Sequence, residues 1–420
     1  MKFGILYNQN NLNIGDDIQA YATARYLPSV DYFIDREHIN EFKSDENEPV
    51  AVIMNAWYMW EKWNWPPSKC IVPHMVGFHY ADHKLAVQPG SPLKYEVLEG
   101  LGGDYLRAYE PIGCRDFFTM GKLKDIGIDA YFSGCITMTL PKMPKIQVEK
   151  EYVCIVDVEE SVKKRLLEIL KDTEYEVKVI THNRSRDSSM PWEERKRIVE
   201  DLLTTYRNAK YVITKRLHCA LPCLSQGTPV LIIKGMTDDI RFSPYGDWLH
   251  WITVKDFLNG NYTYDFNEPL PNKLDFVATR DALEKSCMDF VQAMLTETRS
   301  TEELNRFTHT DEEVHQWRYK LMEQTLSMWL TQERENNNQK LKLQSQNNKL
   351  TADLKKSTAD LKKTKADLKK TTEDLKKSNA NLKKVKADLK AVTDKYEKTF
   401  MRRLIRFAKK VRRAFSFKKH

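Results

Sequence analysis

Two cations and a histidine stand where a strand-like segment gives way to a helix. Residues 213–235 read ITKRLHCALPCLSQGTPVLIIKG, and they include Lys215, Arg216 and His218. In an open parallel sheet, ligands bind beyond the carboxyl ends of the strands, where the following helix also directs its free N–H groups. Arginine offers a planar fork to carboxylate or phosphate, and histidine exchanges a proton near neutral pH. The pattern predicts a site for a small polyanion whose reaction needs proton transfer. The alternative is that both residues are structural: Arg216 would form a salt bridge to a neighbouring loop, and His218 would cap the helix.

A second polar segment, NQNNLNIGDDIQAYA, follows the first apolar strand of the chain. Gly15 permits a tight turn, and Asp16 and Asp17 begin a helix at the end where acids are electrostatically favoured. Helix capping alone would explain these residues. If a site is present, however, two carboxylates would repel a phosphate, so this side is expected to hold a neutral hydroxylated partner. Asp16 is then the candidate acceptor of a hydroxyl proton.

Together with GCRD at 113–116, these segments resemble the polysaccharide pyruvyl transferase family over roughly residues 1–300. The Arg-Leu-His triplet at 216–218, followed by Gly-x-Pro-Val at 227–230, is the most specific part of the resemblance. The chain departs from the family at SGCITMTL, where an Asp-Pro turn is expected, and no role is transferred to that segment.

The resemblance implies a fold like that of the two-Rossmann glycosyltransferases, the GT-B type. It implies an enzyme that moves the pyruvyl group of phosphoenolpyruvate to sugar hydroxyls, forming a ketal and releasing phosphate. By the resemblance, Arg216 would bind the donor and His218 would act as the acid. The residues themselves indicate Asp16 as a second catalytic residue. The remaining residues expected to bind substrate are Lys215, Asn13, Gly15, Asp17, Arg115 and Arg241.

No cofactor or metal is expected beside the donor substrate. His79 and His83 have a spacing that can hold a metal on one helix face, but no third ligand is evident and the reaction needs none. The seven cysteines are scattered through apolar segments without a CxxC pair, which favours a reduced protein.

The elements that must position these residues are clearest in the second half of the body. Continuous Val- and Ile-rich strands alternate there with amphipathic helices, which predicts a parallel sheet covered on both faces. The strands are expected at 152–157, 175–181, 211–214 and 229–233, and the helices at 160–170, 191–209 and 217–226.

The first half contains similar but less regular units. A strand is expected at 2–8 and a helix at 16–27, followed by buried strands at 51–55, 75–79 and 112–115. The simplest α/β architecture that contains these units has two Rossmann-like domains facing a cleft. Residues 1–145 would form the domain on the acceptor side, and residues 146–300 the domain on the donor side.

Beyond the body the composition changes to a long helical extension. A helical connector is expected at 301–340 and a heptad repeat at 341–396, where leucine recurs every seven residues from Leu354 to Leu389. The second core position is held mainly by Ser and Thr, so the seam is thin. Two interpretations of the repeat remain. It is either a weak coiled coil that joins copies of the chain into a homo-oligomer, or a single helical stalk in solvent.

The chain ends in a basic amphipathic segment, 397–420. From Leu341 onward, 26 Lys and Arg face 8 Asp and Glu, so the overall charge of +8 leaves −10 for the first 340 residues. Phe400, Leu404, Phe407, Val411 and Phe415 follow helical spacing among the cations, which is typical of a helix lying on an anionic membrane. Nucleic acid is the alternative partner for a basic segment, but binding to phosphate would not explain the apolar stripe. No signal peptide or apolar run of about 18 residues is present, so the expected location is cytoplasmic and peripheral on the inner membrane face.

Three functions follow as hypotheses. The leading one is an enzyme that pyruvylates a surface polysaccharide or its lipid-linked precursor. A GT-B-type glycosyltransferase using a nucleotide sugar is the second. Such an enzyme would need a Glu pair or a ribose-binding carboxylate near the C-terminal strands, and none can be assigned in this sequence. A catalytically inactive membrane-tethered scaffold is the third, and Arg216 and His218 argue against it.

Overall fold

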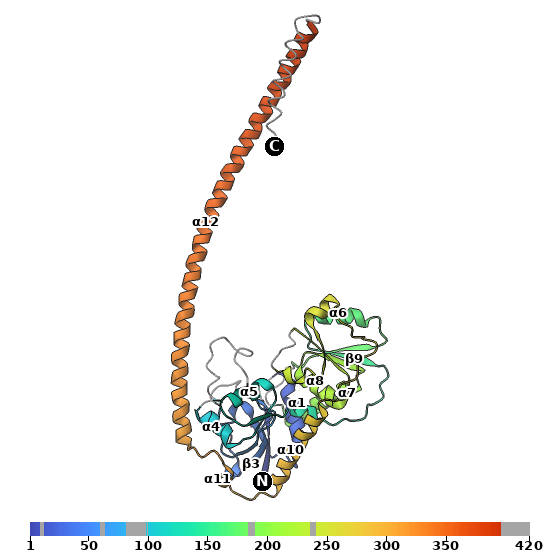
Figure 1. The fold of residues 1–420 in the computed structure, drawn as a ribbon, viewed down its shortest axis with the longest axis vertical. Helices are drawn as coiled ribbons and strands as arrows, with labels where there is room; N and C mark the ends of the chain where they lie inside the picture. Colours follow the sequence, from blue (N-terminus) through green and yellow to red (C-terminus); the bar gives the residue numbers. More distant parts are fainter. Residues whose placement is uncertain are drawn as a thin grey trace. The chain divides into compact units, whose positions relative to one another are not determined.

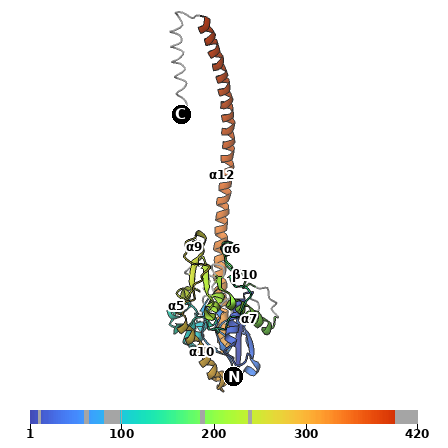
Figure 2. The ribbon, with the colours of Figure 1, turned by 90° about the vertical axis from the view of Figure 1, so that its right-hand side faces the viewer.

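The computed structural model describes residues 1–8, 12–58, 64–80, 98, 100–183, 190–235 and 241–395. By its internal contacts the chain divides into Met1–Leu330 and Thr331–His420. The first unit contains two separate parallel sheets with helices packed on them (Figures 1 and 2). The α/β class with parallel sheets is therefore confirmed, whereas the boundary predicted at 145/146 stays a prediction.

The first sheet has four strands in the order β2-β1-β3-β5, all parallel. They are β1 (Lys2–Tyr7), β2 (Tyr32–Asp35), β3 (Val50–Ile53) and β5 (Ile71–His74), and α1 (Ile14–Ala24) connects β1 to β2. The central strands β1 and β3 are almost entirely buried, as their apolar sequences require. The carboxyl end of β1 thus leads directly into the segment that begins α1.

The strand predicted at 75–79 is wrong. The fourth strand of the sheet is β5, and pairing resumes only with a single bridge from Phe78 to Cys114 and the short strand β6 (His79–Tyr80). Gly77 between them has φ +59° and lies against the side chain of Asn55, so the backbone turns where the apolar pattern suggested a continuous strand. The predicted strand at 112–115 is present as β7 (Ile112–Cys114), paired with β8 (Ala130–Phe132) outside the four-stranded sheet.

The remaining elements of this half are short. They are η1 (Arg36–His38), η2 (Asp45–Asn47), β4 (Trp57–Tyr58), α4 (Gly100–Ala108), α5 (Phe117–Asp125) and η3 (Ile136–Thr139). Strands β4 and β6 pair with each other in parallel, which brings Trp57 beside His79.

The second sheet has five parallel strands in the order β10-β9-β11-β12-β13. Its elements are β9 (Tyr152–Val156), α6 (Glu160–Leu170), β10 (Glu176–Ile180), α7 (Trp192–Asn208), β11 (Tyr211–Thr214), α8 (Leu217–Gln226), β12 (Val230–Lys234), η4 (Ser243–Tyr245), β13 (His250–Thr253) and α9 (Val254–Asn259). The elements predicted between 152 and 233 are confirmed to within two residues at each end. Gly227 ends α8 with φ +79°, a left-handed conformation that glycine adopts without steric cost.

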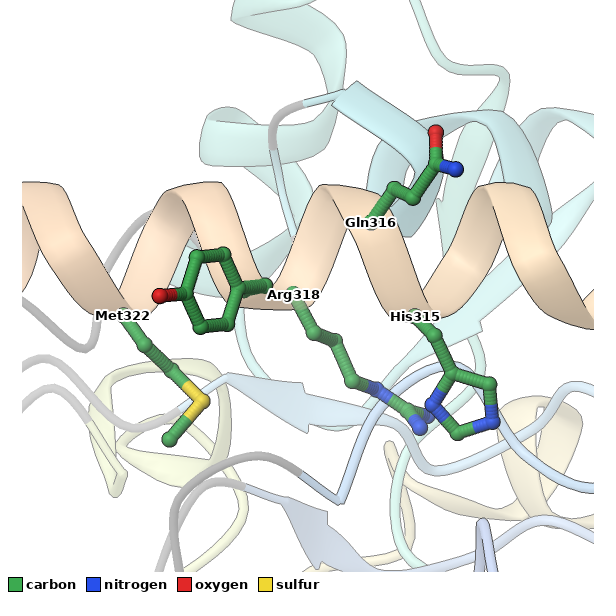
Figure 3. Close-up of a pocket in the computed structure, with 5 residues that line it drawn as sticks. His315, Gln316, Arg318 and Met322 are labelled. Atoms are coloured by element: carbon green, nitrogen blue, oxygen red, sulfur yellow. The ribbon is translucent and has the colours of Figure 1, made fainter.

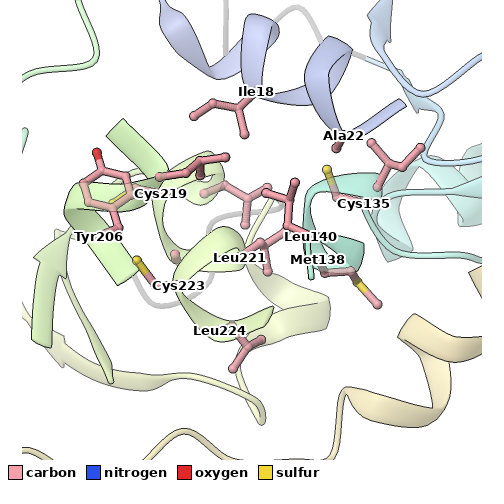
Figure 4. Close-up of a cluster of buried hydrophobic side chains, with 14 of the residues drawn as sticks. Ile18, Ala22, Cys135, Met138, Leu140, Tyr206, Cys219, Leu221, Cys223 and Leu224 are labelled. Atoms are coloured by element: carbon pink, nitrogen blue, oxygen red, sulfur yellow. The ribbon is translucent and has the colours of Figure 1, made fainter. Parts of the chain in front are cut away.

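One apolar core joins elements of both halves. Ile18 and Ala22 of α1 pack with Met138 of η3, Leu221 of α8 and Tyr206 of α7, all fully buried (Figure 4). Helix α10 (Val277–Leu295) adds three buried side chains to the same cluster. Because α1 packs directly on α8, the two segments singled out in the sequence are brought together by the core itself.

The chain then continues through α11 (Thr301–Leu304) into one long helix, α12 (Asp311–Lys395). Helix α12 passes without a break through position 340, where the sequence placed the end of the connector. A C-terminal helix is therefore confirmed, while a coiled coil stays a prediction. The basic segment 397–420 lies outside the described residues. None of the helices in the described ranges is both long and apolar enough to cross a membrane.

Candidate active site

The first turn of α1 lies against His218, and glycine makes this approach possible. A Cβ placed on Gly15 would stand 2.8 Å from Nδ1 of His218 and 3.2 Å from its Cβ. Asn13 caps the helix, since its Oδ1 accepts a hydrogen bond from Gly15 N over 3.1 Å. Ile14 N donates to the carbonyl of His182 over 3.0 Å, which ties this turn to the loop after β10. The Asn13–Gly15 motif therefore sets the distance between α1 and the histidine at the start of α8.

Gly15→Ala is expected to lower the free energy of unfolding by about 1–3 kcal/mol, the usual cost of overpacking a tight contact. The matched control is Gly121→Ala in α5, where nothing lies within 4 Å of the added Cβ. That substitution is expected to stabilise by about 0.4–1 kcal/mol, because it only restricts the unfolded chain. Urea unfolding of both variants measures the difference, and equal stabilities would contradict a close contact between Gly15 and His218.

Arg115 is a buried cation without a carboxylate partner. It follows β7, is 3% exposed, and its carbonyl accepts a 2.7 Å hydrogen bond from the hydroxyl of Tyr245. Its Nη1 lies 3.4 Å from Oε1 of Gln19, and Nε is buried without a hydrogen-bond partner. It forms no ion pair with any carboxylate in the described ranges. Buried charges are normally paired, so this guanidinium has the properties of a group that awaits an anionic ligand.

His79 and Asp116 form a buried pair close to Arg115. Asp116, at the N-terminus of α5, is fully buried, contacts Nδ1 of His79 and accepts a 3.0 Å hydrogen bond from Thr119 Oγ1. Burial and the charge of Arg115 lower the pKa of His79 to about 4, although Asp116 opposes this. His79 is therefore neutral at physiological pH, with Nδ1 engaged by the carboxylate. Sequence reasoning considered His79 only as a metal ligand beside His83, which lies outside the described residues.

His218 stands in the same electropositive surroundings. Its Nε2 is buried and has no hydrogen-bond partner in the part of the chain that the structure describes. Burial lowers the pKa of His218 well below its ordinary value, and the charge of Arg115 lowers it further, followed by His182, Arg241 and His79. Arg115 and Arg241 thus both lower the pKa of His218, and no acidic group of the described residues is among the largest influences on it. In this state His218 is neutral, which differs from the protonated acid that the sequence analysis implies.

Arg216 and Lys215 are engaged by carboxylates. Arg216 Nε lies 2.9 Å from Oδ2 of Asp157, and its Nη2 donates to Oδ1 of Asn183 over 3.2 Å. Lys215 Nζ lies 3.4 Å from Oε1 of Glu159. The salt bridge to a neighbouring loop, which the sequence left as the alternative for Arg216, is thus present. Only part of the Arg216 fork remains available to a ligand, and its role in binding stays a prediction.

Asp157 itself sits in an unusual backbone conformation, with φ +49°. Burial opposes ionisation of its carboxyl, but hydrogen bonds from His182 N and Thr181 and the charge of Arg216 lower its pKa. A non-glycine residue at positive φ is uncommon and is often found at functional sites. The strained loop after β9 therefore holds Arg216 at the carboxyl edge of the second sheet.

The two adjacent aspartates of α1 have different surroundings. Asp16 Oδ1 lies 3.5 Å from Nη1 of the buried Arg36 and accepts a 3.2 Å hydrogen bond from Gln19. Asp17 is 1% exposed and lies 3.4 Å from Nη1 of Arg195 on α7. Asp16 is therefore on the side of Gln19 and Arg115, whereas Asp17 fastens α1 to α7.

Several of these partners were missed in the sequence. Gln19 lies one turn after Gly15, so its place on the same helix face was readable from helical periodicity. Arg36 and Arg195 gave no such signal, because they reach the site from distant elements. Among the described residues, no group of three His, Cys, Asp or Glu side chains has the arrangement of a metal site.

Comparison with known proteins gives one match by sequence family and several by structure. The family model described as polysaccharide pyruvyl transferase matches residues 13–234. No curated protein matches the chain. The UDP-GlcNAc 2-epimerase of Methanocaldococcus jannaschii, solved with UDP-GlcNAc and UDP, is 12% identical with a TM-score of 0.38, covering 71% of this chain and 100% of that one. The E. coli heptosyltransferase WaaC, solved with ADP, is 14% identical with a TM-score of 0.27, covering 70% and 100%. TM-scores of this size do not establish a shared fold.

Proposed function

The chain belongs to the polysaccharide pyruvyl transferase family, and on that premise we propose that its donor is phosphoenolpyruvate. The acceptor would be a sugar of a surface polysaccharide or of its lipid-linked precursor, and the product a pyruvyl ketal. The observation that carries the donor proposal is Arg115, a buried guanidinium whose charge acts on His218 and which forms no ion pair with a carboxylate of the described residues. Phosphoenolpyruvate brings a phosphate and a carboxylate, both of which arginine binds through charge-assisted hydrogen bonds.

Donor binding would also cause His218 to take up the proton that the reaction needs. Without ligand, burial and Arg115 hold the pKa of His218 low. A polyanion placed beside Arg115 and Arg241 neutralises those charges, and the pKa of His218 rises because an adjacent anion favours the imidazolium. The acid is thus charged only when the donor is present, so the lowered pKa in the free state agrees with acid catalysis.

The chemistry then proceeds without an oxidant or reductant. His218 transfers its proton to the methylene carbon, the electron pair of the double bond forms the new C–H bond, and the adjacent carbon becomes electrophilic. A sugar hydroxyl bonds to that carbon and gives up its proton. The C–O bond to phosphate then breaks, and phosphate leaves with the electron pair of that bond. A second hydroxyl bonds to the same carbon and gives up its proton, which closes the ketal. Asp16 is the proposed acceptor of a hydroxyl proton, and His79, held by Asp116, is the other base near Arg115.

A GT-B-like arrangement would suit this reaction, with the acceptor on the side of the first sheet and the donor on the side of the second. Asp16 and Arg36 belong to the first half, and Arg216 and His218 to the second. Arg115 would reach the donor from the first half, where it follows β7. A nucleotide-sugar glycosyltransferase is the alternative that such a fold allows. It differs in its donor, which gives the two hypotheses different products.

The deciding experiment offers the purified full chain phosphoenolpyruvate and, separately, nucleotide sugars, each with a panel of acceptor glycans. Acceptor-dependent release of inorganic phosphate, with a pyruvyl ketal identified by mass spectrometry, is the expected result. Release of nucleotide from a nucleotide sugar, without any dependence on phosphoenolpyruvate, would overturn the donor assignment.

We also propose that residues 397–420 hold the enzyme on the inner face of the membrane, near a lipid-linked acceptor. The support is the sequence pattern of ten Lys and Arg after Glu397 around an apolar stripe.

The full chain is expected to sediment with anionic vesicles and not with neutral ones, because charge attraction and insertion of the apolar stripe act together. A chain ending at Glu397 is expected to remain in the supernatant with an unchanged melting temperature. Phe407→Gln is the variant that separates the two contributions, since it keeps every charge and should weaken binding. Equal sedimentation of the full and shortened chains would contradict the proposal.

A further inference from the structure

Helix α12 carries one heptad phase along nearly its whole length. If Leu354 is an a position, the same phase runs unbroken from His315 to Val392. The a positions are Tyr319, Leu326, Glu333, Lys340, Asn347, Leu354, Leu361, Leu368, Leu375, Leu382 and Leu389. The d positions are His315, Met322, Trp329, Asn336, Leu343, Leu350, Ser357, Thr364, Thr371, Ser378, Val385 and Val392. Apolar residues hold at least one core position of each heptad from Tyr319 to Trp329 and from Leu343 to Val392, whereas Glu333, Asn336 and Lys340 interrupt the seam between these stretches. The second stretch is long enough to impose a seam for supercoiling.

The apolar members of this seam are exposed. The five leucines from Leu354 to Leu382 have exposed fractions of 53–69%. Near the start of the helix, Tyr319, Met322, Leu326 and Trp329 are exposed as well. Apolar side chains at a constant spacing on one face, all left in water, indicate a surface that another helix covers.

The start of α12 separates this seam from the face that packs on the body. Val314 is buried in the core of the first half, and Arg318 Nε donates to the carbonyl of Trp65 over 2.9 Å. Arg318 also lines a shallow hollow together with His315, Tyr319 and Met322, and His315 and Met322 project from the same side of the helix (Figure 3). At the start of α12 the contacts with the body thus come from Val314 and Arg318, neither of which is a seam position, while Tyr319 and Met322 are exposed.

The polar residues of the seam tolerate burial between helices. The hydroxyls of Thr364 and Thr371 donate to the carbonyls of Asp360 and Asp367, over 3.0 Å in each case. Their hydrogen bonds are thus satisfied within the helix, and only their methyl groups are left to pack. Asn347 at an a position is the kind of polar core residue that specifies register in two-stranded coiled coils.

The flanking charges favour parallel alignment. From Asp353 to Asp388, five of the six g positions are Asp and one is Asn381, while Lys365 and Lys386 occupy e positions. In a parallel pair, each g residue meets the e residue five places further along the partner, so Asp360 meets Lys365 and no like charges meet. In an antiparallel pair, g residues meet g residues, and a row of Asp would face a row of Asp.

We infer that α12 pairs with α12 of a second copy of this chain as a parallel, in-register, two-stranded coiled coil. This surface is independent of the proposed donor chemistry. In such a dimer the two basic segments follow the same ends of the paired helices. If the basic ends bind membrane as proposed above, pairing them makes the attachment bivalent.

Sedimentation velocity on the full chain tests the association. Twice the chain mass, independent of concentration over a wide range, is expected. Leu361→Asp with Leu375→Asp should give the mass of one chain, because two charges per helix enter the seam. The control is Lys362→Asp with Lys376→Asp, at outward b positions, which changes more charge and should remain dimeric. A monomeric full chain, a mass above two chains, or two variants that behave alike would overturn the inference.

Cysteine cross-linking tests the orientation. Ser357→Cys, at a d position, faces its own copy only in a parallel in-register pair, and mild oxidation should yield a covalent dimer. Ala359→Cys, two residues away at an outward f position, should yield none. The seven native cysteines are all buried in the body. The chain without an added cysteine therefore serves to measure background cross-linking. A dimer in which Ser357→Cys does not cross-link would refute the parallel arrangement.

Discussion

His218→Gln is expected to lower turnover by roughly 10²–10⁴, the usual contribution of a positioned proton donor. Binding of phosphoenolpyruvate should be nearly unchanged at high pH, because glutamine keeps a hydrogen-bonding group and the arginines remain. Steady-state rates and calorimetric affinities of the folded variant measure the two effects separately. Normal turnover in a folded His218→Gln protein would end the acid-catalysis proposal.

The same variant tests whether donor binding charges His218. In the free protein the pKa of His218 lies well below its ordinary value, so the imidazole is neutral at pH 7. If the donor raises that pKa, binding takes up a proton, and the affinity is greatest at low pH and falls as the pH rises through the pKa of the complex. Calorimetry in buffers with different ionisation enthalpies counts the protons taken up.

Protonation of the donor phosphate also contributes to the number of protons taken up on binding. The quantity to compare is therefore the difference in proton uptake between wild type and His218→Gln. Wild type is expected to take up more protons than the variant across neutral pH. Identical proton uptake by the two proteins would show that His218 stays neutral in the complex.

Arg115→Met is expected to weaken donor binding by about two orders of magnitude, since hydrogen bonds to a charged group are worth about 1.5–3 kcal/mol each. The same change should leave the free energy of unfolding unchanged or raise it. The reason is that Arg115 is buried without an ion pair in the described structure, so its loss removes a desolvated charge and only the longer-range attraction that lowers the pKa of Asp116. Arg115→Lys should restore only part of the affinity, because a point charge does not reproduce the planar fork.

Arg195→Met is the matched control for Arg115. Both arginines are buried, but Arg195 is ion-paired with Asp17 between α7 and α1. Removing it leaves a buried carboxylate without that partner, which typically costs about 3–5 kcal/mol of stability. Urea unfolding and donor affinity are measured for both variants. An Arg115→Met protein that is destabilised as much as Arg195→Met, with normal donor affinity, would assign Arg115 a structural role only.

The sequence by itself determined most of the second half of the body. The strands and helices between 152 and 233 were predictable because buried parallel strands are continuous apolar runs and their covering helices are amphipathic. The first half was less predictable, since β2 and β5 are short and Gly77 interrupts an apolar run that looks like one strand. The residues of the site that belong to local motifs, Gly15, Arg216 and His218, were also found from sequence.

Only the tertiary structure decided which of these groups are available to a ligand. Arg216, which stood out in the sequence, is paired with Asp157, 59 residues away. Arg115, which was expected to bind substrate from the GCRD segment, is a buried cation that forms no ion pair with a carboxylate of the described residues. His79 meets Asp116 across 37 residues, and Asp17 meets Arg195 across 178. Periodicity reports the face that a residue occupies on its own element, but the charge it meets there depends on which distant elements pack against that face.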